Sequence, residues 1–158
     1  MTMRRWLGVL LVTALFVPAP AQAASSDACA SGFDAGNSWE FAWTIVPPRN
    51  CTGQMDGNDG ADWYAVNVPP GSLSARLDVN VCPTSSWDPD VRLYFATSTQ
   101  LLLVQGPGTL KASSVNGSGQ CDRVSATLST TDAAQGGRWY IHVYVFSGAG
   151  AYSMAVVS

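Results

Sequence analysis

One segment of the chain crowds oxygen-bearing side chains onto a glycine-rich turn. It spans residues 56–62 with the sequence DGNDGAD and leads into an alternating apolar stretch. Calcium takes about six to eight oxygen ligands from carboxylates, amides and backbone carbonyls. Asp56, Asn58, Asp59 and Asp62 could contribute such ligands, and calcium is the one cofactor that the sequence suggests. The alternative is a turn whose side chains cap backbone N–H groups, with Asp62 held structurally where the strand starts.

A second candidate site is a row of amphipathic rings, Tyr140, His142 and Tyr144, which alternates with apolar residues. Period two places the three rings on the outward face of a strand. Because such side chains anchor interfaces, we predict a binding face here. The alternative is that a loop covers this face, which would make the rings ordinary packing residues.

His142 is also the chain's one histidine, so a Ser-His-Asp or Cys-His catalytic machine would have to use it. The sequence contains no Gly-x-Ser-x-Gly elbow, and the cysteines are expected to be oxidised. A second acidic pair, Asp88 and Asp90, brackets Pro89. A glycosidase could use two carboxylates, but it would also need an aromatic sugar cleft, and only Trp87 lies near them in sequence. We interpret this pair as a solvated turn and predict that the protein is not an enzyme.

The four cysteines, Cys29, Cys51, Cys82 and Cys121, are an even number, which predicts two disulfides in an oxidising compartment. Three pairings are possible. We favour Cys29–Cys51, which would attach the N-terminal segment to the next loop, and Cys82–Cys121, which would connect the end of one strand to the start of another.

The N-terminal residues 1–23 have the pattern of a secretory signal peptide. Arg4 and Arg5 precede an apolar run, and Ala21-Gln22-Ala23 is a small-x-small cleavage site. The apolar run is short for a membrane span, which needs about 20 residues. Cleavage after Ala23 leaves six basic side chains against eleven acidic ones. The basic residues are scattered, so the composition argues against nucleic acid as a partner. We expect a secreted protein, extracellular or periplasmic, with no membrane span after cleavage.

The elements that position these side chains are predicted to be strands, because turn residues separate short alternating runs and no convincing helix is present. The run 101–104 is continuously apolar and is expected to be covered, and 111–120 is expected to be a long loop. Seven or eight antiparallel strands predict an all-β, two-sheet, jelly-roll-like β-sandwich, with 24–158 as one domain. The expected strands are 39–45, 64–68, 73–81, 91–95, 124–128, 139–145 and 152–156.

Four motifs, in order, resemble the bacterial pre-peptidase C-terminal domain family, which is related to the collagen-binding domains of clostridial collagenases. They are GNDGADWYAV at 57–66, DPDVRLY at 88–94, GRWYIHV at 137–143 and GAGAYSM at 148–154. The resemblance implies a secreted sandwich that usually accompanies a peptidase. Calcium-binding members take ligands from an acidic N-terminal linker, whereas here Asp27 is the single acid between Ala23 and Cys29.

The resemblance and the missing catalytic residues together predict a secreted, non-catalytic accessory module. Its expected partner is an extracellular protein, peptide or polysaccharide, or a separate secreted peptidase. In the collagen-binding relatives, tyrosines on a sandwich face serve this purpose, which agrees with the row at Tyr140 and Tyr144. Two alternatives remain: a small secreted hydrolase or peptidase inhibitor, and a structural protein of the cell envelope.

Overall fold

The structure is a computed structural model that describes residues 28–158. The predicted signal peptide and its cleavage site, residues 1–23, lie outside the described residues. Within the described part, no helix has the length and apolar character needed to cross a membrane.

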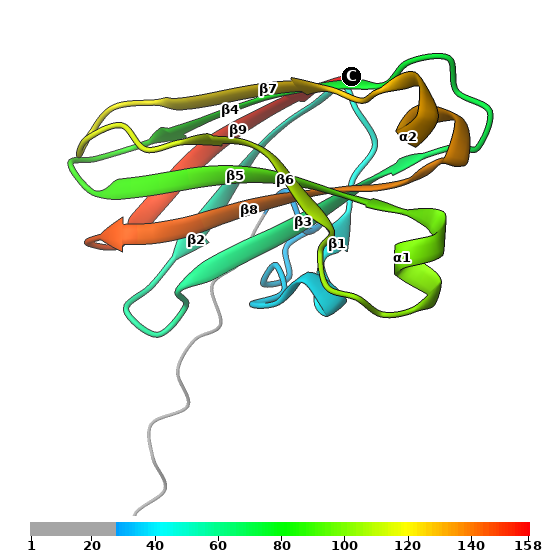
Figure 1. Ribbon diagram of the computed structural model, residues 1–158. Coiled ribbons are helices and arrows are strands. Elements are labelled where there is room, and N and C mark those ends of the chain that lie inside the picture. The colour runs from blue at the N-terminus through cyan, green and yellow to red at the C-terminus, as the bar shows by residue number, and fades with distance from the viewer. Residues whose placement is uncertain (1–27) are drawn as a thin grey trace, which may run out of the picture.

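Two sheets stack face to face, with two short helices, α1 and α2, at one end (Figure 1). The five-stranded sheet has the order β1-β3-β8-β5-β6 and the four-stranded sheet the order β2-β9-β4-β7. All pairings are antiparallel except the short β1–β3 pair, as expected of the predicted β-sandwich. The strands are β1 (Trp43–Thr44), β2 (Arg49–Met55), β3 (Ala61–Val68), β4 (Arg76–Pro83), β5 (Asp88–Thr97), β6 (Thr109–Ser114), β7 (Asp122–Thr127), β8 (Gly137–Ser147) and β9 (Gly150–Val157).

The core lies between the sheets and follows the period-two pattern of the sequence. Tyr64 on β3 is fully buried, and Val66 and Val68 on the same face are nearly so, as predicted. β4 contributes Leu77 and Val81 in the same way. Burial of one face of each strand supplies the main stabilisation of such a sandwich.

The aromatic run at 39–45 does not form the expected strand. Trp39–Phe41 is a 3-10 helix, η1, and only Trp43–Thr44 pairs with β3. The alternation of aromatic residues suggested a strand, but Trp39 instead packs on the outer face of the five-stranded sheet, where its ring meets Tyr140 edge to face. The N-terminal segment therefore covers part of this sheet.

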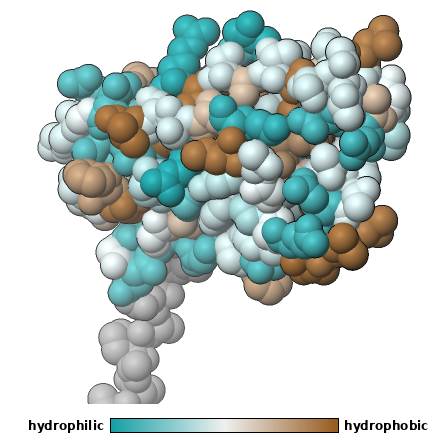
Figure 2. All heavy atoms as spheres, in the orientation of Figure 1, coloured by the Kyte–Doolittle hydropathy of each residue, from teal (hydrophilic) through white to brown (hydrophobic). Residues whose placement is uncertain are grey.

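Two expectations for the middle of the chain are also wrong. The apolar run 101–104 is not covered, because Leu102 and Val104 are exposed at the end of helix α1 (Ser98–Leu102). Figure 2 shows hydrophobic side chains gathered over this end of the molecule. The polar stretch after Lys111 is not all loop, since Thr109–Ser114 pairs with β5 as edge strand β6. Helix α2 (Thr130–Gln135) was not expected either.

Both favoured disulfides are present, Cys29–Cys51 and Cys82–Cys121. The first attaches the N-terminal segment to β2. The second joins the end of β4 to the residue before β7, so that it closes a loop containing β5 and β6. Closing a loop of this size stabilises a fold by about 2–4 kcal/mol.

A buried chain of hydrogen bonds crosses the core. The hydroxyls of Tyr64 on β3 and Tyr152 on β9 lie 2.6 Å apart, and the Tyr152 hydroxyl donates to Asp62 Oδ2 at 2.5 Å. Gly53 on β2 pairs with Tyr152, and a Cβ at Gly53 would overlap the Cζ and Oη atoms of the Tyr152 ring. The glycine therefore leaves the space that the ring needs to reach Asp62.

Gly53→Ala should lower the free energy of unfolding by about 1–3 kcal/mol, because the new methyl group displaces the Tyr152 ring. Gly57→Ala is the matched control, since nothing lies within 4 Å of a Cβ at Gly57. Urea unfolding of both variants measures the difference. Equal stability of the two variants would contradict this account of Gly53.

Candidate functional site

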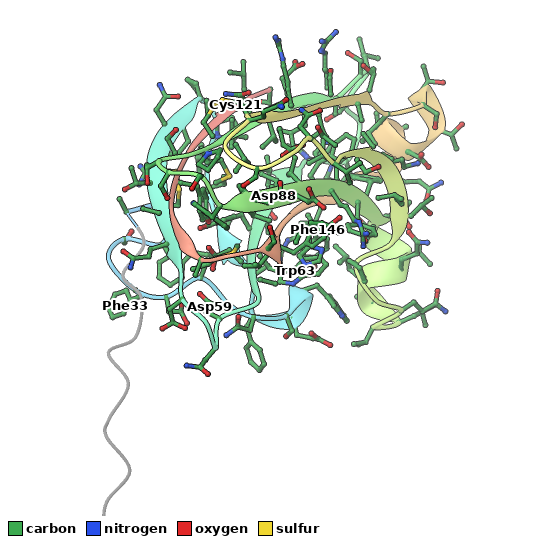
Figure 3. The ribbon with its side chains drawn as sticks, turned by 90° about the vertical axis from the view of Figure 1, so that its left-hand side faces the viewer. Phe33, Asp59, Trp63, Asp88, Cys121 and Phe146 are labelled. Atoms are coloured by element: carbon green, nitrogen blue, oxygen red, sulfur yellow. A yellow bond between two sulfur atoms is a disulfide. The ribbon has the colours of Figure 1, made fainter. Side chains whose placement is uncertain are left out.

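Two clusters of carboxylates occur in the described part of the chain, and both lie at the end of the sandwich opposite the helices. Figure 3 looks onto this end and labels one acid from each cluster, Asp59 and Asp88. The clusters are Asp34 with Asp59 and Asp62, and Asp88 with Asp90 and Asp122. Within each, the three side chains can place one oxygen each within 4.8 Å of the others.

The first cluster contains two of the four predicted calcium ligands, Asp59 and Asp62. Asp59 and Asp62 are buried, and Asp62 faces the core and Tyr152. The third carboxylate is Asp34, from the N-terminal segment that the Cys29–Cys51 disulfide attaches to β2. With its amide nitrogen turned toward the cluster, Asn37 donates to Asp59 Oδ1 and to the carbonyl of Ala61.

The other two predicted ligands, Asp56 and Asn58, do not belong to this cluster. Asp56 Oδ1 accepts from the backbone N–H of Asn58 at 2.7 Å and of Asp59 at 3.1 Å. Asn58 is exposed. Asp56 thus forms the Asx turn that the sequence offered as the alternative. This turn positions Asp59 for the cluster.

The second cluster replaces the solvated turn that we expected at Asp88 and Asp90. Both residues belong to β5, and both are buried, at 7% and 3% exposure. Asp122, at the start of β7, joins them from the other sheet and is completely buried. Three acids therefore face one another where β5, β7 and the 115–121 loop meet.

The second cluster is tightly held but incompletely hydrogen-bonded. Asp122 Oδ1 accepts from Ser114 Oγ at 2.5 Å and from the backbone N–H of Asn116 at 2.9 Å. Asp122 Oδ2 and Asp88 Oδ1 are buried and have no hydrogen-bond partner among the described residues. Burial, and then the charges of Asp122 and Asp88, raise the pKa of Asp90, while a hydrogen bond from Tyr144 acts in the opposite direction.

The predicted row of rings on β8 lies on the outer face of the five-stranded sheet. His142 stacks on Trp63 of β3, with 4.0 Å between ring centroids, and on Tyr144, with 5.0 Å. The Arg92 guanidinium lies 4.5 Å from the Tyr144 ring centroid. Phe146, two residues further along the strand, is 73% exposed. Trp63, His142 and Tyr144 thus form one stacked array, and Phe146 lies exposed beyond it along β8.

Tyr140 does not present its ring to solvent as predicted. It is 2% exposed, because Trp39 of η1 and Trp63 pack against its ring. Here the alternative of a covering segment is correct. His142 and Tyr144 remain half-buried, so the accessible part of the row begins at His142 and ends at Phe146.

His142 is poorly placed for catalysis. Its Nδ1 is buried and has no hydrogen-bond partner in the described part of the chain. Burial and the nearby charge of Arg92 lower its pKa to about 4. A catalytic histidine needs a group that orients its ring and a nucleophile within hydrogen-bond reach. The neighbours that the structure gives this ring include the aromatic rings of Trp63 and Tyr144 and the cationic Arg92.

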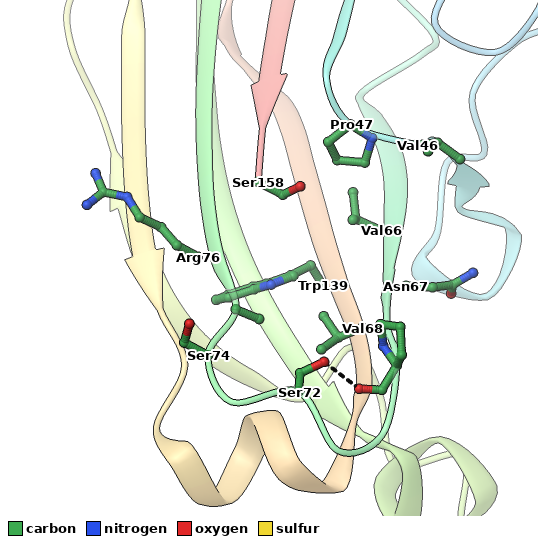
Figure 4. A pocket seen from close by; sticks show the side chains of 12 residues that line it. Val46, Pro47, Val66, Asn67, Val68, Ser72, Ser74, Arg76, Trp139 and Ser158 are labelled. Carbon is green, nitrogen blue, oxygen red and sulfur yellow. Dashed lines mark hydrogen bonds between the residues drawn. The ribbon is translucent and has the colours of Figure 1, made fainter.

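Two pockets of similar volume differ in the residues that line them. One, of about 490 Å³, lies near the helical end and is lined by Val66, Arg76, Trp139 and Ser158 among others (Figure 4). Its described lining contains no His, Asp or Glu. The other, of about 510 Å³, is lined by Asp88 and Asp90 of the second cluster and by Arg92, Tyr144 and Phe146. Of these two pockets, the second is the one whose described lining combines side-chain carboxylates with aromatic rings.

The sequence could not easily indicate Asp34 and Asp122. Each lies more than 20 residues from its partners in the cluster. A signal for Asp122 did exist: it follows Cys121, and Asp88 lies six residues after Cys82. The favoured Cys82–Cys121 disulfide therefore limits the distance between these two acids, although six residues of extended chain can still span about 20 Å.

The fold resembles that of a solved protein. It matches the pre-peptidase C-terminal domain of a collagenase from Bacillus anthracis with a TM-score of 0.54 and 18% sequence identity, over 73% of this chain and 93% of that chain. No protein-family model matches the chain, and no curated protein matches it. At this identity the similarity concerns the fold, which is the β-sandwich that the four motifs implied.

The lowered pKa of His142 predicts a pH-dependent stability. In the unfolded chain His142 binds a proton near pH 6.5, whereas in the folded protein it does so only near pH 4. The stabilisation is therefore complete above pH 6.5 and is lost as the pH falls toward 4. The raised pKa of Asp90 has the opposite effect. Melting temperatures should fall over this range, and His142→Gln should make the slope shallower. An unchanged slope in the variant would contradict the assignment.

Proposed function

We propose that this protein is a secreted, non-catalytic binding module that holds an extracellular protein or polysaccharide against the outer face of its five-stranded sheet. The observation that carries this proposal is the stacked array of Trp63, His142 and Tyr144, with Arg92 over its end. Aromatic side chains and arginine are the residue types that dominate binding energy at interfaces, and here two of the three stacked rings, His142 and Tyr144, are half-buried rather than buried.

The position of the array supports this role. Rings on β8 increase in exposure along the strand, from buried Tyr140 through half-buried Tyr144 to exposed Phe146. His142 and Arg92 hold the Tyr144 ring in place, so that this ring loses little conformational entropy when a partner binds. The adjoining pocket gives a partner side chain or sugar ring a place to enter.

The similarity to a collagenase's pre-peptidase C-terminal domain agrees with an accessory role, and the two disulfides suit an oxidising compartment. A hydrolase is less well supported, because His142 has aromatic neighbours and a pKa lowered to about 4. The partner could also be a separate secreted peptidase.

Binding can be tested by pull-down onto insoluble collagen, cellulose and chitin, and from culture supernatant. Phe146→Ala and Tyr144→Ala should each reduce retention on the bound material by about tenfold or more, because each removes ring area at the exposed end of the array. Leu102→Ala with Leu103→Ala is the matched control, since it removes exposed apolar side chains at the opposite end of the sandwich.

Two results would overturn the proposal. One is binding that the control variant weakens as much as the array variants do. The other is the absence of binding to every material, combined with hydrolytic activity that depends on His142. A melting curve for each variant separates loss of binding from loss of folding.

We further propose that Asp34, Asp59 and Asp62 hold a calcium ion. The donor set fits this group, because three carboxylates converge within 4.8 Å and hard oxygen ligands suit calcium. The bound ion would supply a positive charge that fixes the N-terminal segment to the turn before β3. Cys29–Cys51 then holds the same segment covalently.

Calcium should stabilise the purified protein, by about 2.7 kcal/mol when its concentration is a hundredfold above the dissociation constant. Asp34→Asn should remove this contribution. Asp56→Asn is the matched control, because the amide oxygen can still accept the two N–H groups of the turn. Thermal melts with calcium and with a chelator measure both variants, and an equal loss in the two would contradict this site.

A further inference from the structure

We propose a second divalent-cation site, formed by Asp88, Asp90 and Asp122, for a hard ion of the calcium type. These carboxylates come from two strands of opposite sheets and place one oxygen each within 4.8 Å of one another. The proposal does not depend on the ligand-binding role of the aromatic array or on the cluster at Asp34.

The first argument is the burial of unpartnered oxygen atoms. Asp122 is completely buried and Asp88 is 7% exposed. Asp122 Oδ2 and Asp88 Oδ1 have no hydrogen-bond partner in the described part of the chain. Buried polar atoms are nearly always satisfied, so two such oxygens in one cluster indicate an ion or another group between them.

The second argument is charge. Three carboxylates this close repel one another, and burial strengthens the repulsion because the local dielectric is low. The positive charge of Arg92 lowers the pKa of Asp90, but the Arg92 guanidinium lies over the Tyr144 ring. A divalent cation would balance the cluster, and the chemistry of the donors selects a hard ion rather than a soft one.

The third argument is access and rigidity. Asp88 and Asp90 line the pocket of about 510 Å³, so an ion can reach them from solvent. Hydrogen bonds from Ser114 and Asn116 fix the Asp122 carboxylate, and the disulfide at the adjacent Cys121 fixes its backbone. One carboxylate is thus fixed before binding, which lowers the entropic cost of ordering the site.

The test is calorimetry with calcium chloride on the chelator-treated protein, using variants that keep the side-chain shape. Asp122→Asn retains the oxygen that accepts from Ser114 and Asn116, and Asp88→Asn retains its volume. We expect each to weaken one calcium-binding event at least tenfold. Asp132→Asn, a carboxylate paired with Lys111 outside the cluster, should not change that event.

The Asp34→Asn variant distinguishes calcium binding at the first cluster from binding at the second. Calcium binding that survives in Asp34→Asn and disappears when Asp122→Asn is added supports the second site, whether or not Asp34 binds an ion. Binding that is lost entirely in Asp34→Asn, or that Asp88→Asn and Asp122→Asn leave unchanged, overturns it.

Melting in chelator provides an independent measurement that does not assume the variants fold equally well. Without calcium, Asp88→Asn and Asp122→Asn should melt at or above the temperature of the unsubstituted protein, because each removes one repelling charge. Calcium should then raise the melting temperature of the unsubstituted protein but have a smaller effect on the variants. Variants that melt lower in chelator, with no calcium effect on the unsubstituted protein, would show that the acids are structural and bind no ion.

Discussion

The hydrogen bonds from Tyr64 to Tyr152 and from Tyr152 to Asp62 are the constraint on which much of this sandwich depends. They join β3 of one sheet to β9 of the other through buried polar atoms, and burying such atoms is costly unless they are paired. The register of both strands must therefore bring these groups together. Trp63 directly follows Asp62 in β3 and so points to the opposite face. The same register therefore places Trp63 on the outer face of the sheet, where it stacks on His142.

A strand with period two thus serves two surfaces at once. Asp62 and Tyr64 face the core, while Trp63 supports the aromatic array outside. The acidic turn before β3 is held by Asp56 and places Asp59 beside Asp34. Structural and candidate functional groups therefore share one short segment, and a change that shifts the strand would be expected to alter both.

The sequence was most informative where alternation or covalent chemistry determined the structure. The core face of β3 and both disulfides could be predicted, because period two and an even cysteine count leave few options. Trp39 was misplaced because aromatic alternation does not distinguish a strand from a segment that lies over a sheet. The burial of Asp90 could not be seen, since it depends on a loop and on Asp122 from the other sheet.

The strand order also determines when the fold can form. β8 lies between β3 and β5, and β9 lies between β2 and β4, so these two consecutive strands each occupy an interior position, one in each sheet. Neither sheet can be completed until β8 and β9 are available. The pairs β4–β7 and β5–β6 can form without these strands, but joining them to β2 and β3 requires contacts between segments distant in sequence, which form slowly. Loss of β9 alone would leave β2 and β4 without the partner that joins them.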